Sequence, residues 1–286
     1  MNKPRATPGQ HSIDLNMPCW EGYQEALLEL FGESVATTKL PDVAALQSLL
    51  CPTVSNLQGQ AIQFVSPSSL PAGNYEENIF TTGKVSTRPN NWHDVFNALV
   101  WWRFPALKAA MNAIHYAEQQ KQSGSGRGTL RDALTLWDEC GIIVASAHGR
   151  VLETLANRNW QGAFQDFAHL WRNDVRVFIC GHALLEKFLD PYKAITAHAL
   201  LVQIDPDSFA VGRENLQKDL DRALAAKLVQ GDLIKSTAYL SPLPLAGVPG
   251  WWTSGEQDDE FYADTAVFRT PASPIVPAPV FKMDLH

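Results

Sequence analysis

The residue pattern predicts an α+β fold: one compact mixed domain in which helices pack on a small, largely antiparallel sheet. Helical and strand-like stretches intermix along the 286 residues without the regular alternation of βαβ units. A hydrophobic content of 45% supplies enough apolar side chains for one large core. From residue 241 onward the chain is rich in proline and tryptophan, which favours an extended C-terminal segment laid across that core.

We expect a single domain over residues 1–286. Its core should cover about residues 40–270, preceded by a helical extension over about residues 1–40. The tail over about residues 271–286 contains four prolines and is expected to be partly disordered.

Apolar periodicity predicts the individual elements. Helices are predicted over 20–32, 41–50, 92–104, 106–120, 149–171 (in two pieces), 182–190 and 212–231. Strands are predicted over 60–67, 174–181 and 194–204. Segment 131–146 is predicted to form a β-hairpin, because two apolar, β-prone runs flank Asp138, Glu139, Cys140 and Gly141. Residues 121–128, rich in glycine and serine, are predicted to form a flexible loop.

The net charge and the positions of the cysteines argue against several classes of protein. A net charge of −7 leaves no excess of cations for non-specific binding to nucleic acid or to an anionic membrane surface. No apolar signal segment opens the chain, so we expect a cytoplasmic protein. The uncharged stretch 236–255 contains three prolines and is not expected to span a membrane. The cysteines form no C-x-x-C pair, which argues against a zinc knuckle and a disulfide framework; they are Cys19, Cys51, Cys140 and Cys180.

The helix that starts at Trp92 carries polar residues in apolar surroundings. Asn91 and Asp94 have the spacing of a helix cap, which explains Asp94 without any function. His93 and Asn97 share one face of this helix, and buried polar groups of this kind need partners. These partners are either other core groups or a ligand, so His93, Asp94 and Asn97 are candidate ligand-binding residues.

A second group of polar residues has the composition of a metal site. His182 and Glu186 are four residues apart on one predicted helix face, and His198 lies on the next element. Two imidazoles and a carboxylate suit Zn²⁺ or Fe²⁺ and leave a coordination position open for water. The alternative is structural: His182 caps the strand-to-helix turn, and Glu186 forms an ion pair with a lysine or arginine.

Acidic residues in the predicted hairpin are candidates for catalysis. Asp138 and Glu139 could act as an acid/base pair, with Arg131 as a ligand-binding residue nearby. The alternative is turn formation, in which Asp138 and Gly141 are common. No phosphate-binding glycine loop, G-x-S-x-G or H-E-x-x-H motif is present, so nucleotide binding and serine hydrolysis have no support.

Four segments together resemble a known bacterial family, domain of unknown function 3025. They are 75–112, 131–146, 181–201 and 242–252, within a resemblance that covers roughly residues 60–270. Its most specific parts are Asn-Trp-His-Asp at 91–94 and Gly-His-Ala-Leu at 181–184. The resemblance implies a soluble protein of Gram-negative bacteria and supplies no catalytic residues.

The residues support two hypotheses about function. In the first, the protein is a cytosolic enzyme whose His and carboxylate residues converge on one pocket around a divalent metal. Metal-bound water would then hydrolyse a small molecule, with Asp138 or Glu139 as the general base. In the second, an aromatic-rich surface binds a protein or peptide, and the polar residues form only a structural network. That surface would comprise Trp251, Trp252, Phe261 and Tyr262.

Overall fold

The computed structural model describes residues 11–32, 36–37, 39–50, 53–70, 73–121, 128–271 and 274–285. Its α-helices are α1 Gln24–Phe31, α2 Val43–Ser48, α3 Tyr75–Thr82, α4 Trp92–Arg103, α5 Pro105–Lys121, α6 Thr129–Cys140, α7 Gly149–Ala156, α8 His182–Lys187, α9 Arg213–Gln230 and α10 Asp259–Tyr262. A π-helical turn occupies Gly162–Asp166. Residues 122–127 of the predicted loop, and Cys51, lie outside the described residues.

The strands form one five-stranded sheet and two small ladders. They are β1 His11–Ser12, β2 Ala36–Thr37, β3 Gln63–Val65, β4 Lys84–Ser86, β5 Gly141–Ser146, β6 Val175–Ile179, β7 Thr196–Ile204, β8 Ser241–Pro244 and β9 Val280–Met283. The large sheet has the order β6-β5-β7-β8, and β9 also pairs with β7. Strand β5 is parallel to β7, and β7 is parallel to β9. The sheet is therefore mixed rather than largely antiparallel, because long helical connections separate these parallel neighbours in sequence.

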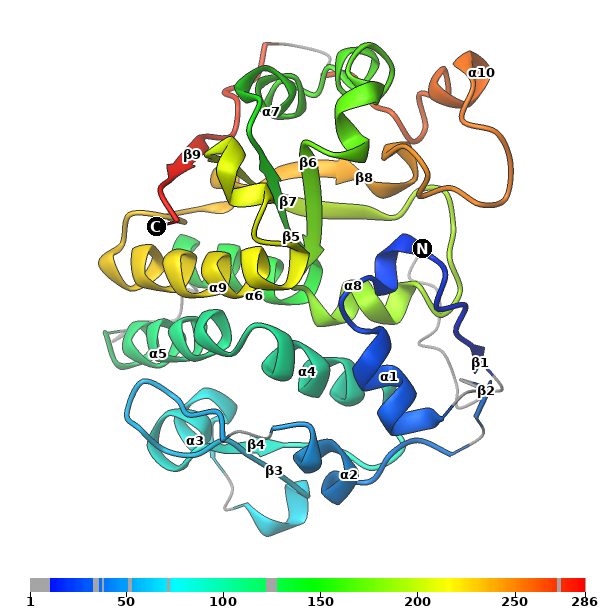
Figure 1. The fold of residues 1–286 in the computed structure, drawn as a ribbon. Coiled ribbons are helices and arrows are strands. Elements are labelled where there is room, and N and C mark those ends of the chain that lie inside the picture. Colours follow the sequence, from blue (N-terminus) through cyan, green and yellow to red (C-terminus); the bar gives the residue numbers. More distant parts are fainter. Residues whose placement is uncertain are drawn as a thin grey trace.

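The elements lie in layers, which confirms the compact α+β class (Figure 1). The large sheet lies in the upper half of the view, with α7 above it and α6, α8 and α9 below it. Helices α4 and α5 form the next layer, followed by α3 with the β3–β4 ladder. One cluster of buried apolar side chains runs through these layers, from Ile79 in α3 through Trp101 in α4 and Trp137 in α6 to Leu200 in β7. Trp20 and Tyr23, just before α1, are buried, so this described part of the predicted N-terminal extension belongs to the core.

The hairpin predicted over 131–146 is wrong. Residues up to Cys140 form α6, and only Gly141–Ser146 form a strand. Ala133, Leu134 and Trp137 are fully buried, and their spacing of one, three and four residues is that of a helix face. Asp138 and Glu139 consequently lie in the last turn of a helix and not in a β-turn.

The C-terminal segment completes the sheet. Strand β8 covers the first half of β7, through Thr196–Ala199, and β9 covers its second half, through Leu201–Ile204. Strand β9 lies in the tail for which the sequence predicted partial disorder. Among the described helices, none has both the length and the apolar composition needed to cross a bilayer.

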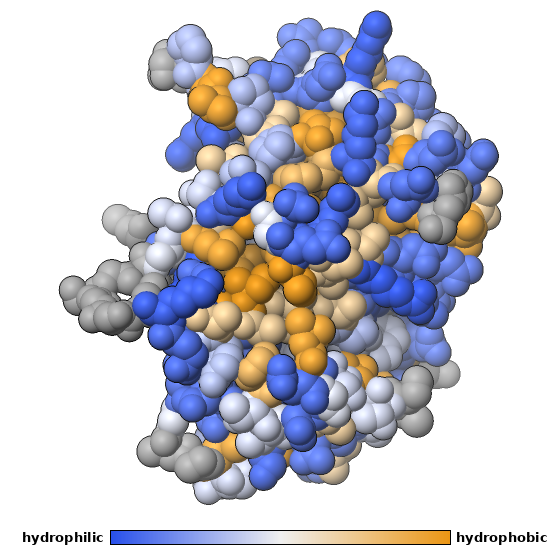
Figure 2. All heavy atoms as spheres, turned by 90° about the vertical axis from the view of Figure 1, so that its left-hand side faces the viewer, coloured by the Kyte–Doolittle hydropathy of each residue, from blue (hydrophilic) through white to orange (hydrophobic). Residues whose placement is uncertain are grey.

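Apolar side chains also reach the surface. Figure 2 shows the left-hand side of Figure 1, where an apolar band is bordered by hydrophilic residues. Helix α10, with Phe261 and Tyr262, lies at the opposite side in Figure 1, so this band is not the predicted aromatic surface. Phe261 is 8% exposed and Tyr262 donates a hydrogen bond to the carbonyl of Gly247. Phe261 and Tyr262 therefore pack against other aromatic side chains of the chain, among them Phe164 and Phe268, as expected for a C-terminal segment laid across the core.

Candidate metal centre

A cavity of about 600 Å³ lies between α3, α4, α5, α6 and α8. Its lining is mostly polar: Asn74, Tyr75, Glu76, Ser86, Arg88, His93, Asp94, Asn97, His115, Gln119, Arg131, Thr135, Asp138, Glu139 and His182. Seven of the nine candidate residues from the sequence are in this set. They come from α4, α6 and α8, so the tertiary fold brings together segments that are up to about 90 residues apart.

Helix α4 positions His93 at its first turn. The side chain of Asn91 accepts a hydrogen bond from Asp94 N, which confirms the predicted N-cap. The Asp94 carboxylate does not complete a reciprocal cap. It accepts two hydrogen bonds from the Arg88 guanidinium, at 2.7 and 3.0 Å, and a third from Arg88 N at 2.6 Å. The segment before α4 is thereby fixed to the helix, with His93 turned into the cavity.

Helix α8 positions His182 through a close approach of two backbones. A Cβ atom on Gly181 would lie 2.3 Å from Gly141 N and 2.7 Å from the carbonyl oxygen of Glu139. Only glycine permits this approach, because real Cβ contacts are not that short. His182 therefore lies directly beside the last turn of α6, where Asp138 and Glu139 are.

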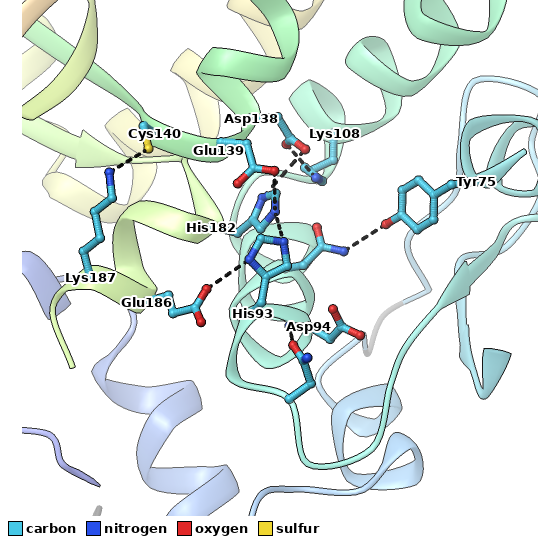
Figure 3. Close-up of polar contacts among 12 residues, drawn as sticks. Tyr75, His93, Asp94, Lys108, Asp138, Glu139, Cys140, His182, Glu186 and Lys187 are labelled. Atoms are coloured by element: carbon cyan, nitrogen blue, oxygen red, sulfur yellow. Dashed lines mark hydrogen bonds and ion pairs between the residues drawn. The ribbon is translucent and has the colours of Figure 1, made fainter. Parts of the chain in front are cut away.

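The two imidazoles meet edge to face at the cavity wall (Figure 3). His93 Nε2 lies 3.0 Å from His182 Nε2, and the ring planes are 76° apart. Glu139 Oε1 lies 4.0 Å from His182 Nε2, and the ligand atoms of His93, Glu139 and His182 all lie within 4.8 Å of one another. Ligands of a tetrahedral Zn²⁺ lie about 3.4 Å apart, given bonds of about 2.1 Å. The three side chains thus have nearly the spacing of a metal-binding set.

Each imidazole also faces a carboxylate with its other nitrogen. His93 Nδ1 lies 3.1 Å from Glu186 Oε2, within hydrogen-bond distance. His182 Nδ1 lies 3.7 Å from Asp138 Oδ2 and makes no hydrogen bond to any described residue. Asp138 in turn accepts a 2.6 Å hydrogen bond from the buried Lys108 ammonium. Metal-binding histidines almost always have a carboxylate, carbonyl or water on the nitrogen that does not bind the metal.

The electrostatic surroundings distinguish the two histidines. Burial lowers the pKa of His182 to about 4, although the Asp138 carboxylate opposes this. Burial also acts against protonation of His93, but Glu186, Glu139 and Asp94 outweigh it and raise the His93 pKa. A neutral His182 can accept a proton or a metal ion at Nε2. Without a metal, the 3.0 Å contact holds one proton between the two Nε2 atoms.

Two predicted metal ligands do not belong to the set of three. Glu186, four residues after His182, hydrogen-bonds His93 from outside the cavity and orients that ring. His198 lies on β7 opposite Gly141 and is absent from the cavity lining. Burial and the nearby Lys187 lower its pKa, which places His198 in different surroundings. The predicted ligand set of His182, Glu186 and His198 is therefore not assembled in the fold.

The remaining predicted residues lie in the cavity wall. Asn97 Nδ2 donates to the Tyr75 hydroxyl at 3.1 Å, whereas its buried Oδ1 has no hydrogen-bond partner among the described residues. A buried carbonyl oxygen of this kind is a binding point for water or a ligand. Arg131 also lines the cavity.

Glu76 and Lys108 were not selected from the sequence as candidate site residues. Glu76 lines the cavity, where it accepts a 2.7 Å hydrogen bond from Asn112 Nδ2. Burial, only partly offset by Asn112, raises its pKa to about 7. Lys108, Asn112 and His115 are all at least 90% buried, so their stripe is an inner face of α5. The sequence did contain one signal for this buried face, which is the helical spacing of Lys108, Asn112 and His115 directly after the aromatic residues of α4.

Comparison with protein families gives one result. The chain matches the model of a family described as a protein of unknown function (DUF3025) over residues 62–271. No curated protein and no solved structure matched the chain. The matched range contains His93, Glu139 and His182, so the candidate centre lies within the family region. Because the match covers well over half of the sequence, the chain belongs to the DUF3025 family.

Proposed function

We propose that this protein is a cytosolic metal-dependent hydrolase that acts on a small polar molecule. His93 Nε2, His182 Nε2 and a Glu139 oxygen would hold one divalent ion, Zn²⁺ or Fe²⁺. A single observation carries the proposal: two imidazoles and a carboxylate converge within 4.8 Å, and each imidazole faces a further carboxylate with its other nitrogen. Two histidines and one carboxylate are a common ligand set of catalytic zinc and non-haem iron.

The metal ion would supply a bound water of lowered pKa and polarise the bond to be cleaved. Binding requires the lone pairs of both Nε2 atoms, so the proton between them must leave. Glu186 then orients the His93 ring through Nδ1–H, the Asp138 carboxylate faces the Nδ1 side of His182, and Lys108 keeps Asp138 ionised and in place. The sequence-based roles are therefore revised: Glu139 is a ligand, and Asp138 is a positioning residue.

We assign proton transfer to Glu76. Of the carboxyl groups that line the cavity, Asp94 is bound by Arg88, Asp138 by Lys108, and Glu139 is used as a ligand. The hydrogen bond that the Glu76 carboxyl accepts from a described side chain comes from the amide of Asn112. A carboxyl group with a pKa near 7 can both accept and donate a proton at neutral pH.

Metal analysis of four variants tests the centre. Protein purified without tags is stripped with chelator, reloaded with Zn²⁺ or, anaerobically, with Fe²⁺, desalted and analysed for metal. We expect about one ion per chain in the native protein and in His198→Ala. His93→Ala, His182→Ala and Glu139→Ala should retain little metal, because each removes one of three protein ligands.

The control separates a specific site from adventitious binding, since His198 is a histidine of this chain outside the proposed ligand set. Equal metal loss in His198→Ala, or a native protein that retains no metal, contradicts the proposal. The polar groups would then be a structural network, and His182→Ala would lower only the free energy of unfolding. Visible absorption of the Co²⁺-loaded protein provides a second readout, because a tetrahedral site gives intense bands that are absent from His182→Ala.

A further inference from the structure

A second hollow, of about 260 Å³, lies along the outer side of β6 and shares no lining residue with the metal cavity. Its charged and aromatic lining residues are Arg172, Arg176, Arg213, Glu21, Trp171 and Trp251. Its volume is near the lower end of small-molecule sites, about 300–1,000 Å³. The hollow therefore suits a small ligand.

The hollow is strongly cationic in an otherwise acidic protein. Three guanidinium groups face one carboxylate, Glu21, whereas the whole chain carries a net charge of −7. Arg213 Nε lies 3.2 Å from Glu21 Oε1, but its N–H makes no hydrogen bond to a described residue. The lining thus carries two positive charges in excess of its own counter-charge.

Two of the three arginines are held in place by the backbone. Strand β6 is an edge strand, so its outer carbonyl groups have no strand partner. Arg213 Nη2 donates to the carbonyl of Val177, and Arg176 Nη1 donates to those of Val175 and Arg172. The guanidinium of Arg213 also stacks on the Phe178 ring at 4.6 Å. Each guanidinium has five N–H donors, and these contacts use only some of them.

Arg213 is half-buried. Its side chain is 20% exposed, and removing a cation from water is unfavourable unless counter-charges balance it. Burial lowers its pKa to about 10, and repulsion from Arg176 and Arg103 adds to this despite Glu21. An anion bound in the hollow would provide Arg213 with a further counter-charge and would offset its repulsion from the neighbouring arginines.

We propose that this hollow binds a phosphomonoester that carries a flat ring. A phosphate dianion matches the excess of two charges, and its three terminal oxygens match guanidinium donors. Trp171 and Trp251 provide apolar walls for the ring. This proposal is independent of the metal centre.

Calorimetric titration of chelator-treated protein with phenyl phosphate and with inorganic phosphate, at low chloride concentration, tests the proposal. We expect phenyl phosphate to bind with a Kd below about 1 mM and inorganic phosphate about tenfold more weakly. The Arg176→Ala and Arg213→Lys substitutions should each weaken the binding of phenyl phosphate by about tenfold or more, since each removes charge-assisted hydrogen bonds.

Two control variants test whether phenyl phosphate binds in this hollow and not elsewhere on the protein. Arg158→Ala should bind as the native protein does, because Arg158 lines a different hollow beside Trp160. His182→Ala should also bind normally, since it changes only the metal cavity. Loss of binding in His182→Ala, equal affinity for the two ligands, unchanged binding by Arg176→Ala, or no saturable binding at 10 mM, about ten times the expected Kd, would each overturn the proposal.

Discussion

At the scale of single residues, the centre depends on charges that are paired before any ligand arrives. Asp94, Asp138 and Glu186 are acceptors for Arg88, Lys108 and His93, so three carboxylates are used for orientation. Glu76 differs because its half-buried carboxyl accepts a hydrogen bond from an amide, that of Asn112, among the described residues. This difference gives Glu76 its own pH dependence.

Replacing Glu76 by Gln should stabilise the protein at high pH. Folding raises the Glu76 pKa from 4.5 to about 7, so the folded chain binds more protons between these values than the unfolded chain does. The contribution of Glu76 to stability is therefore present below about pH 4.5 and lost as pH rises through 7. We expect Glu76→Gln to increase the free energy of unfolding at pH 8 by roughly 1–3 kcal/mol, with little gain at pH 5.

Urea denaturation at the two pH values measures this effect. Glu77→Gln is the matched control, because Glu77 is an exposed carboxyl on the same helix. If both variants gave the same small change at each pH, Glu76 would be an ordinary solvated carboxyl, and its proposed role in proton transfer would be wrong.

At the scale of elements, one helix caps another across the core. Helix α5 begins at Pro105, and its first backbone N–H groups have no acceptor within the helix. Asp221 on α9 accepts from Ala106 N at 3.0 Å and from Leu107 N at 2.9 Å. This carboxylate is 4% exposed, and burial raises its pKa to about 6 although the two backbone donors oppose the shift. The contact fixes the position of α5 and hence of Lys108.

Replacing Asp221 by Ala should therefore destabilise the fold. Two buried N–H donors lose their acceptor, which costs roughly 1–3 kcal/mol in the free energy of unfolding at pH 7. Asp219→Ala, on the same helix, removes only a 3.7 Å pair with the exposed Arg222 and should change stability by less than about 0.5 kcal/mol. Equal urea midpoints for the two variants would show that Asp221 does not cap α5.

At the scale of the whole molecule, the chain end completes the sheet. Strands β8 and β9 both pair with β7, opposite the side occupied by β5. Met283 is buried, and Phe281 stacks on Tyr239 with ring centroids 6.4 Å apart. Without β9, the second half of β7 would be an unpaired edge.

Truncation after residue 279 should consequently lower the free energy of unfolding by about 2–4 kcal/mol, since it removes a strand ladder and a buried methionine side chain. The shorter truncation after Met283 should have a small effect. Thermal and urea unfolding of the two truncated proteins measure the difference. If both truncations were neutral, the sequence-based expectation of a disordered tail would describe the protein better than β9 does.

The sequence by itself determined the features that depend on local interactions. Apolar spacing and caps such as Asn91 located the helices, and a polar residue on an apolar helix is conspicuous wherever the chain folds. His93 and His182 were identified in this way, whereas Asp138 and Glu139 were selected as acidic residues in a predicted hairpin. The hairpin error has the same local origin, because the turn-forming residues before Gly141 outweighed the helical spacing of Leu134 and Trp137.

Only the tertiary structure decided which of these groups meet. The spacing in the sequence placed His182 and Glu186 on one helix face and suggested that both bind one metal ion. The packing of α8 against α4 instead brings Glu186 within hydrogen-bond distance of His93. His198 follows in sequence and yet lies on β7, away from the cavity. Strand direction, the burial of Lys108 and the pKa of Glu76 were decided in the same way. The physical reason is that distances, burial and charge pairing between separate elements depend on packing, and a single sequence contains no local signal for them.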